Sequence, residues 1–275
     1  MLQQAADAIR DADALLICAG AGIGVDSGLP DFRGDDGFWE AYPPLRDAGI
    51  PFTQIASPEM FYENPALAWG FYGHRLNLYR ATVPHPGFSL LKQWAGAKPF
   101  GSFVFTSNVD GQFQKADFDA GRIAECHGSI HHLQCLYGCS WEIWSADDDA
   151  VVVDTATLRA SGKLPHCPNC LQIARPNVLM FNDWRWQHTR SEAQERELES
   201  WLTQVLGNHG KIAVVEIGAG RAIPTVRLLA ERVADATAAT LIRINPRDCA
   251  LPARGVCVGL PFGSLDALTR IAALV

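Results

Sequence analysis

The sequence of 275 residues lacks any apolar run close to the roughly 18 uninterrupted residues that a membrane helix needs. Its N-terminus lacks the basic stretch and apolar core of a secretory signal. It also lacks a basic excess, because its net charge at pH 7 is −7, whereas nucleic-acid-binding proteins concentrate Lys and Arg. We therefore expect an untargeted, cytoplasmic globular protein that binds neither membranes nor nucleic acid.

The eight cysteines are few and unevenly spaced. In Cys135-x3-Cys139 and Cys167-x2-Cys170 they form two close pairs, with 27 residues between the pairs. Without a signal sequence, such pairs indicate a metal site before disulfides. Four thiolates would hold Zn²⁺ tetrahedrally and leave no open coordination position, which predicts a structural ion; four reduced thiols in a small core are the alternative. The scattered cysteines are expected to pack as small apolar side chains: Cys18, Cys126, Cys249 and Cys257.

Strand and helix patterns alternate along the chain. Short β-rich apolar runs occupy residues 14–18, 103–106, 212–217 and 241–244, and several end in glycine or polar loops. Apolar residues at helical spacing run from Leu198 to Leu206, with Gly207 as a stop, and again from Leu265 to Ile271. This alternation predicts an α/β fold with a Rossmann-like, doubly wound parallel sheet, whose ligands bind at the carboxyl ends of the strands.

Two segments interrupt the pattern. Residues 38–65 are rich in Pro, Gly and aromatic residues, and we interpret them as a long irregular excursion or lid. Residues 131–175 contain the cysteine pairs and no strong period, which indicates a small insertion. The predicted domains are therefore a discontinuous Rossmann-like domain (1–40, 86–130 and 175–275), a helical and loop lid (41–85) and a zinc-ribbon domain (131–174).

The first predicted strand leads into Ala19-Gly20-Ala21-Gly22-Ile23-Gly24, so that glycines fall where a strand would turn into a helix. Glycines at such a turn let backbone N–H groups approach a pyrophosphate at the helix N-terminus. A turn that merely packs strand on helix is the alternative. An ordinary dehydrogenase would place an acidic residue about 20 positions further on, after a second strand. Glu40 lies in the irregular segment instead, which disfavours that class.

The segment Ser27-Gly28-Leu29-Pro30-Asp31-Phe32-Arg33-Gly34 is far more specific. Further blocks follow it in order: Thr106-Ser107-Asn108-Val109-Asp110-Gly111, Cys126-His127-Gly128, the two cysteine pairs, residues 175–183, Gly218-Ala219-Gly220 and Ile244-Asn245. Together, over about residues 14–245, these blocks resemble the motifs of the sirtuins, which are NAD-dependent protein deacylases.

The resemblance implies a set of cofactor-binding and catalytic residues. His127 would be the general base, since an imidazole can accept a proton from a ribose hydroxyl near neutral pH, and Asn108 and Asp110 would complete the catalytic group. The residues implied for NAD binding are Gly20, Ala21, Gly22 and Ile23 at the phosphates, Pro30, Asp31, Phe32 and Arg33 in the cofactor loop, Ser107, Asn108, Val109 and Asp110 near the nicotinamide and its ribose, and Gly218, Ala219, Gly220 and Asn245 along the adenosine half.

Two further segments concern the substrate. Tyr72 and Arg75 have the Tyr-x-x-Arg spacing that binds an acyl carboxylate in desuccinylase-type sirtuins, and this spacing puts both side chains on one face of a helix. An ordinary surface helix would show the same pattern. Phe181, Asn182 and Asp183 correspond to the family's acyl-peptide strand, where Phe-Gly-Glu is usual. Other departures are Ser107 for Gln, Gly24 for Ser, and Gly218-Ala219-Gly220 for Gly-Thr-Ser.

The leading hypothesis is an NAD-dependent protein lysine deacylase that removes acetyl, succinyl or malonyl groups and releases nicotinamide and O-acyl-ADP-ribose. Its partners would be an acyl-lysine protein or peptide, with NAD as co-substrate and Zn²⁺ as a structural ion. The altered Phe181-Asn182-Asp183 segment leaves an ADP-ribosyltransferase or NAD hydrolase of sirtuin fold as the alternative. A noncatalytic nucleotide sensor or zinc-ribbon module is disfavoured, because a mere binder has no need of His127.

Overall fold

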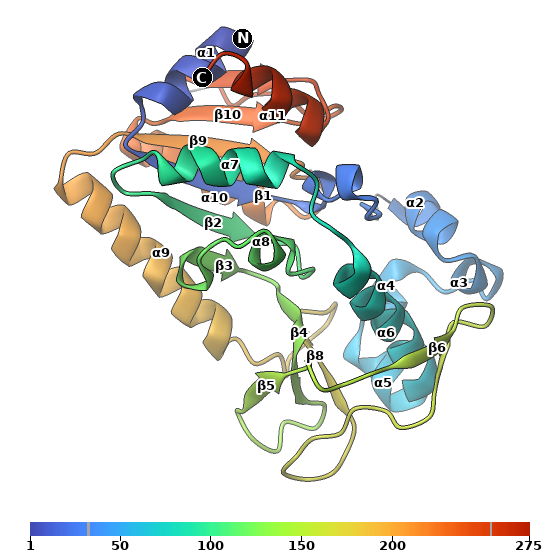
Figure 1. Ribbon diagram of the computed structural model, residues 1–275. Coiled ribbons are helices and arrows are strands. Elements are labelled where there is room, and N and C mark those ends of the chain that lie inside the picture. Colours follow the sequence, from blue (N-terminus) through green and yellow to red (C-terminus); the bar gives the residue numbers. More distant parts are fainter. Residues whose placement is uncertain (32–33, 254) are drawn as a thin grey trace.

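A six-stranded parallel sheet forms the centre of the computed structural model, which describes residues 1–31, 34–253 and 255–275 (Figure 1). The strand order is β11-β10-β9-β1-β2-β3. The chain therefore builds one half of the sheet outward from β1 and then returns to build the other half on the opposite side. The strands are β1 (Ala14–Ala19), β2 (Ser102–Thr106), β3 (Ile123–Glu125), β9 (Ile212–Ile217), β10 (Thr240–Ile244) and β11 (Cys257–Leu260).

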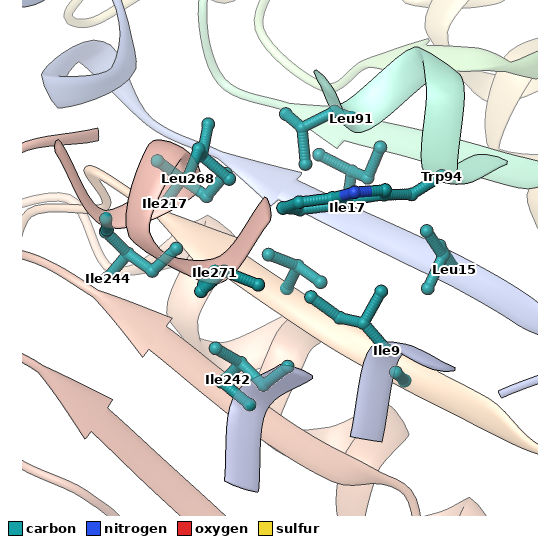
Figure 2. Packing of buried hydrophobic residues seen from close by; sticks show 14 of the residues in the cluster. Ile9, Leu15, Ile17, Leu91, Trp94, Ile217, Ile242, Ile244, Leu268 and Ile271 are labelled. Carbon is teal, nitrogen blue, oxygen red and sulfur yellow. The ribbon is translucent and has the colours of Figure 1, made fainter. Parts of the chain in front are cut away.

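Helices cover both faces of this sheet. Successive side chains of a strand point to opposite faces, and all six residues of β1 are buried. Leu15 and Ile17 pack in one cluster with residues of α1 (Leu2–Asp11), α7 (Gly87–Gly96) and α11 (Ser264–Ala272), and Figure 2 shows Trp94 of α7 beside Ile17. Leu16 and Cys18 pack on the other side with α9 (Thr189–Gly207) and α10 (Thr225–Thr237). None of the helices in the described ranges is long and apolar enough to cross a bilayer.

A smaller, mainly antiparallel region lies at the end of the sheet (Figure 1). Strands β4 (Gly128–Cys135), β5 (Ile143–Ser145) and β8 (Ala174–Val178) form a three-stranded sheet in the order β5-β4-β8, and β6 (Val152–Asp154) pairs with β7 (Arg159–Ser161). This sheet extends a few residues beyond the 131–174 range expected for the zinc domain. The division into domains stays a prediction.

The expectation of an irregular segment over residues 38–65 is wrong. Five helices occupy residues 34–81: α2 (Gly34–Ala41), α3 (Pro43–Asp47), α4 (Phe52–Ile55), α5 (Pro58–Glu63) and α6 (Pro65–Ala81). The prolines that suggest loops stand at the first helical position of α3, α5 and α6, where a missing N–H and a fixed φ favour helix initiation. The Asn64 side chain also caps α6 by accepting the Leu67 backbone N–H at 3.2 Å.

The four predicted strands and two predicted helices are confirmed, with differences at their ends. Helix α9 begins at Thr189, well before its apolar spacing becomes regular. The expected α-helix after the glycine turn is absent, and two 3₁₀ turns, η1 (Ala21–Ile23) and η2 (Val25–Ser27), follow β1. The edge strands β3 and β11 are too short to show a pattern in the sequence. Two short helices, α8 (Gln112–Lys115) and η3 (Ala120–Arg122), complete the fold.

His85, which follows α6, joins the chain there to the 3₁₀ turns η1 and η2 that follow β1. Its backbone N–H donates to the Ser27 hydroxyl at 2.9 Å, and its Nδ1 accepts the Gly87 N–H at 3.0 Å. Nε2 therefore carries the ring proton and donates it to the Ile23 carbonyl at 2.9 Å. Burial lowers the pKa of His85, which keeps this neutral tautomer. The point where the chain leaves the sheet domain and the point where it returns are thus held together.

Gly70 lets α6 lie directly against the strand-rich insertion, because a Cβ there would be 2.0 Å from the Leu158 carbonyl oxygen. We predict that Gly70→Ala destabilises the protein by roughly 1–3 kcal/mol through overpacking. Gly96→Ala, at the end of α7 where nothing lies within 4 Å, is the matched control. It should be neutral or slightly stabilising. Urea unfolding of both variants measures the difference; equal stabilities would contradict this close approach.

Candidate active site

A cavity of about 730 Å³ opens at the carboxyl ends of the central strands. The loops that follow β1, β2 and β9 line one part of it, and residues of α6 and of the segment after β8 line another. The order of strands reverses between β1 and β9, which makes this crevice the topological switch point where α/β sheets bind ligands. Its volume lies within the usual range for small-molecule sites, roughly 300–1,000 Å³.

The loops after β1 and β9 are in backbone contact where they line this crevice. A Cβ at Gly22 would lie 2.7 Å from the Gly218 Cα, and one at Gly218 would lie 2.4 Å from the Ile23 nitrogen. Gly218 also has a φ of +64°, which favours glycine. The glycines are therefore required for packing one loop on the other. The same loops also line the cavity, and their contact with a pyrophosphate stays a prediction.

The segment after β2 presents buried polar groups to the cavity. The Thr106 hydroxyl donates to the Ala19 carbonyl at 2.9 Å, and the Asn108 amide donates to the Gly20 carbonyl at 3.2 Å, which ties this segment to the first loop. The Asp110 carboxylate accepts the Gln112 backbone N–H at 3.0 Å. Burial raises the pKa of Asp110 to about 6, although that hydrogen bond opposes the rise. The carboxylate is therefore predominantly ionised at neutral pH.

His127 lies in the link between β3 and β4 and also lines the cavity. Its backbone carbonyl accepts the Leu179 N–H at 3.0 Å. A Cβ at Gly128 would lie 2.0 Å from the Asn177 carbonyl oxygen, so the start of β4 lies directly against β8. The Thr225 hydroxyl lies 3.5 Å from Nε2 of the ring. Burial lowers the pKa of His127, so the imidazole is neutral near pH 7 and can accept a proton.

The 181–183 segment places its three side chains differently. Phe181 and Asn182 line the cavity. Asn182 has a φ of +56°, a left-handed conformation that Asn tolerates better than most residues. Asp183 does not line the cavity; its carboxylate forms a buried ion pair with Arg175 at 2.7 Å and accepts the Met180 N–H at 3.3 Å. At the position of the family's glycine this chain thus has a left-handed Asn182, and Asp183 holds the segment through its ion pair.

Tyr72 and Arg75 also line the cavity, from α6, and both are buried. This placement disagrees with the alternative of an ordinary surface helix. Burial alone would lower the pKa of Arg75, but the surrounding Tyr79, Tyr42 and Tyr72 raise it on balance. The guanidinium is therefore charged inside a mainly aromatic environment.

Most of the residues predicted for the site come together in this one cavity: Gly20, Ala21, Gly22, Pro30, Asp31, Tyr72, Arg75, Ser107, Asn108, Val109, Asp110, His127, Phe181, Asn182, Gly218, Ala219 and Gly220. Ile23, Asp183 and Asn245 lie outside its lining. Ile23 is in the core, and the Asn245 amide donates to the Ala219 carbonyl at 2.9 Å, so it supports the loop after β9. Phe32 and Arg33 lie outside the described residues.

Several cavity residues were not predicted from the sequence: Leu29, Phe52, Ala56, Tyr79, Val178, Leu179, Met180, Arg221, Ala222, Ile223, Val226 and Asp248. Tyr79 was within reach of sequence reasoning, because it stands one turn beyond Arg75 and two turns beyond Tyr72 on the same helical face. Phe52 and Ala56 were hidden within the segment expected to be irregular. The position of Asp248 in the cavity lining depends on how the turn after β10 folds back, and no sequence pattern indicates that turn.

The four paired cysteines converge at the far end of the small sheet. The sulfur atoms of Cys135, Cys139, Cys167 and Cys170 all lie within 4.8 Å of one another. Two Sγ–Sγ distances are 3.6 Å (Cys135–Cys170) and 3.5 Å (Cys139–Cys167). These exceed a disulfide bond and approach the roughly 3.8 Å edge of a tetrahedron with Zn–S bonds of about 2.3 Å. The cluster therefore fits a tetrahedral Zn²⁺ ion, as the spacing predicts.

The fold and the cavity together define a nucleotide-binding protein of the Rossmann type with an inserted metal-binding region. A model of the Sir2 family matches residues 20–213. The chain is 27% identical to an NAD-dependent protein deacylase of Aquifex aeolicus over 85% of this chain and 84% of that protein. It is 30% identical to one of Aeropyrum pernix over 82% of this chain and 78% of that protein. The chain belongs to the Sir2 family.

Solved structures show the same fold. A Sir2 homologue in complex with ADP-ribose superposes with a TM-score of 0.70 at 20% identity, over 98% of this chain and 95% of that one. A Sir2 protein solved with a deacetylated peptide and O-acetyl ADP-ribose superposes with a TM-score of 0.66 at 18% identity, over 99% and 97% of the two chains.

We predict that the purified protein contains one Zn²⁺ per chain, and that Cys167→Ser lowers this to near zero, because three thiolates hold the ion far more weakly than four. Cys249→Ser, outside the cluster, is the matched control and should keep the full metal content. Elemental analysis of the dialysed proteins measures both. An unchanged zinc content in Cys167→Ser would show that the cluster is not the binding site.

Proposed function

We propose that this Sir2-family protein is an NAD-dependent protein lysine deacylase that transfers the acyl group of a modified lysine to ADP-ribose and releases nicotinamide. The observation that carries this proposal is the convergence of Asn108, Asp110 and His127 with the glycine loops on one cavity. A protein that only binds nucleotides needs the loops but not a neutral, half-buried imidazole beside them. The deacylase names of the relatives support the same activity.

The residues present fit NAD. The loops around Gly20–Gly22 and Gly218–Gly220 line the cavity at the carboxyl ends of β1 and β9, where α/β sheets bind the phosphates of a nucleotide. The Asp110 carboxylate can accept hydrogen bonds from a carboxamide, and Asn108 is held at the end of β2 where a ribose would lie between the two loops. When bound, NAD supplies an activated ribose carbon from which nicotinamide leaves. Asn108 and Asp110 would position that carbon by holding the ribose and the carboxamide on either side of it.

His127 is proposed as the general base. Its ring is neutral near pH 7 because burial lowers its pKa, so it can take a proton from a ribose hydroxyl without first losing one itself. Activity should then fall as the pH drops through this lowered pKa, because protonation removes the acceptor nitrogen. The Thr225 hydroxyl at 3.5 Å is the polar neighbour of Nε2 in the described structure.

The acyl-lysine would enter between α6 and the segment after β8. Phe181 and Asn182 lie at this part of the cavity and are proposed to border the peptide. Tyr72 and Arg75 offer a hydroxyl and a permanent positive charge, which suit an acyl chain that ends in a carboxylate. Within the deacylase class we therefore propose succinyl- or malonyl-lysine as the preferred substrate.

Nicotinamide release with and without an acyl-lysine peptide tests the activity. We expect release to depend on the peptide, and we expect His127→Ala to reduce turnover at least a hundredfold, the usual contribution of a general base. NAD binding to His127→Ala, measured by calorimetry, should persist, because the loops are unchanged. Release that ignores the peptide would indicate an NAD hydrolase or ADP-ribosyltransferase instead, and full turnover by His127→Ala would refute the assignment of the base.

A panel of acetyl-, succinyl- and malonyl-lysine peptides tests the acyl class. Arg75→Met should lower kcat/KM for the acidic peptides roughly tenfold to a hundredfold, the range of a lost hydrogen bond to a charged group, and leave the acetyl peptide within about twofold. Tyr72→Phe should have a smaller effect in the same direction. Equal losses on all three peptides would mean that Arg75 supports the fold and does not select the acyl chain.

A further inference from the structure

Tyr79 holds Arg75 in place within the cavity. The Nε and Nη2 atoms of Arg75 donate to the Tyr79 hydroxyl at 2.9 and 2.7 Å. Both side chains are buried, with Tyr79 at 4% and Arg75 at 8% of their full exposure. Two hydrogen bonds from one edge of a planar guanidinium to a single oxygen fix the plane as well as the position of the group.

Aromatic rings enclose the same guanidinium. Its central carbon lies 5.2 Å from the ring centre of Phe71, 5.4 Å from that of Tyr79 and 6.0 Å from that of Tyr72, which are distances of cation–π attraction. The Tyr79 hydroxyl is a neutral acceptor, since burial raises the pKa of its phenol. It therefore orients the Arg75 guanidinium without neutralising its charge. A carboxylate in the same place would orient the guanidinium but would also neutralise it.

Tyr79 is itself anchored to the cofactor side of the cavity. Its backbone carbonyl accepts the Gln112 side-chain amide at 3.2 Å and the Lys115 ammonium at 3.4 Å, both from α8. The Gln112 backbone N–H in turn donates to the Asp110 carboxylate. The end of α6 is thus attached to α8, the short helix that follows Asn108 and Asp110. This attachment fixes the backbone position from which the Tyr79 side chain extends.

We propose that Tyr79 is a positioning residue for acyl selection. Its hydroxyl holds the Arg75 guanidinium in the orientation that receives the carboxylate of an acidic acyl group. The inference rests on the proposed preference for such acyl groups and extends it to a residue that acts through Arg75. Tyr79 should accordingly influence the acidic substrates and leave the acetyl substrate and NAD unaffected.

The test is a double-mutant cycle on kcat/KM with succinyl- and acetyl-lysine peptides, using Tyr79→Phe, Arg75→Met and the double variant. Tyr79→Phe removes only the hydroxyl, and we expect a loss of about tenfold on the succinyl peptide, mainly in KM, with less than a twofold change on the acetyl peptide. The double variant should resemble Arg75→Met alone, because Tyr79 has nothing left to orient. Tyr62→Phe, which loses a hydroxyl bonded to the Leu136 carbonyl in the small domain, is the matched control and should match the wild type on both peptides.

The outcomes distinguish the positioning role of Tyr79 from the proposed preference for acidic acyl groups. If Arg75→Met is selective and Tyr79→Phe behaves as the wild type, the role of Tyr79 is wrong and the acyl preference stands. Additive losses in the double variant, or equal losses on both peptides, would likewise overturn the positioning role. If the wild type shows no preference for succinyl-lysine, both the acyl preference and the positioning role of Tyr79 are wrong.

If Tyr79→Phe does not fold, Arg75→Lys replaces it in the test. Lysine keeps the positive charge but lacks the planar guanidinium that Tyr79 orients, so we expect at least a tenfold loss of kcat/KM on the succinyl peptide. A retained preference for the succinyl peptide would refute the proposal.

Discussion

The contact between the loops after β1 and β9 is the constraint on which the cavity depends. The two strands are neighbours at the centre of the sheet, and their loops meet with no space for a side chain between Gly22 and Gly218. Because no side chain fits between the loops, backbone and small residues form the floor of the crevice. The buried amide of Asn108, bonded to the Gly20 carbonyl, extends that floor to the end of β2.

The walls of the cavity come from parts of the chain that are not in the sheet. On one side, α6 brings Tyr72, Arg75 and Tyr79; on the other, the chain passes from β8 into the segment held by the Arg175–Asp183 ion pair. A buried ion pair contributes less to stability than its short distance suggests, because both charges lose their hydration. Breaking it by removing one partner is nevertheless costly, so it holds the segment in a single arrangement. The cavity thus combines a floor of closely packed loops with walls that are held by a few polar contacts.

Much of this arrangement could be predicted from the sequence, for identifiable reasons. The central strands are continuous apolar runs, and the cysteine pairs carry their own spacing, so the sheet and the metal site were both within reach. The prolines between residues 38 and 65 led to a wrong prediction of loops, since Pro43, Pro58 and Pro65 begin helices. The glycine turn was expected to open an α-helix, but the chain forms 3₁₀ turns there.

Within the site, the sequence motifs identified which loops form the cavity, but they did not identify which residues contact one another. Residues within ordered motifs, such as Asn108 and His127, came together as expected, and their roles stay predictions. Asp183 was expected beside a peptide but lies in the core with Arg175, a pairing that depends on how β8 meets the following turn. Local spacing cannot specify such partners, because they come from different parts of the chain and are chosen by packing.

The bonds from His85 to Ser27 and Ile23 make the lid an insertion with a closed base. The sheet continues on either side of this base as if the intervening helices were absent, because the chain departs and returns at one place. Strand β2 therefore pairs with β1 directly, although five helices separate the two strands in the chain between Gly34 and Ala81. The residues proposed for acyl selection, Tyr72, Arg75 and Tyr79, therefore all lie within this excursion, whereas the glycine loops of the cavity lie outside it.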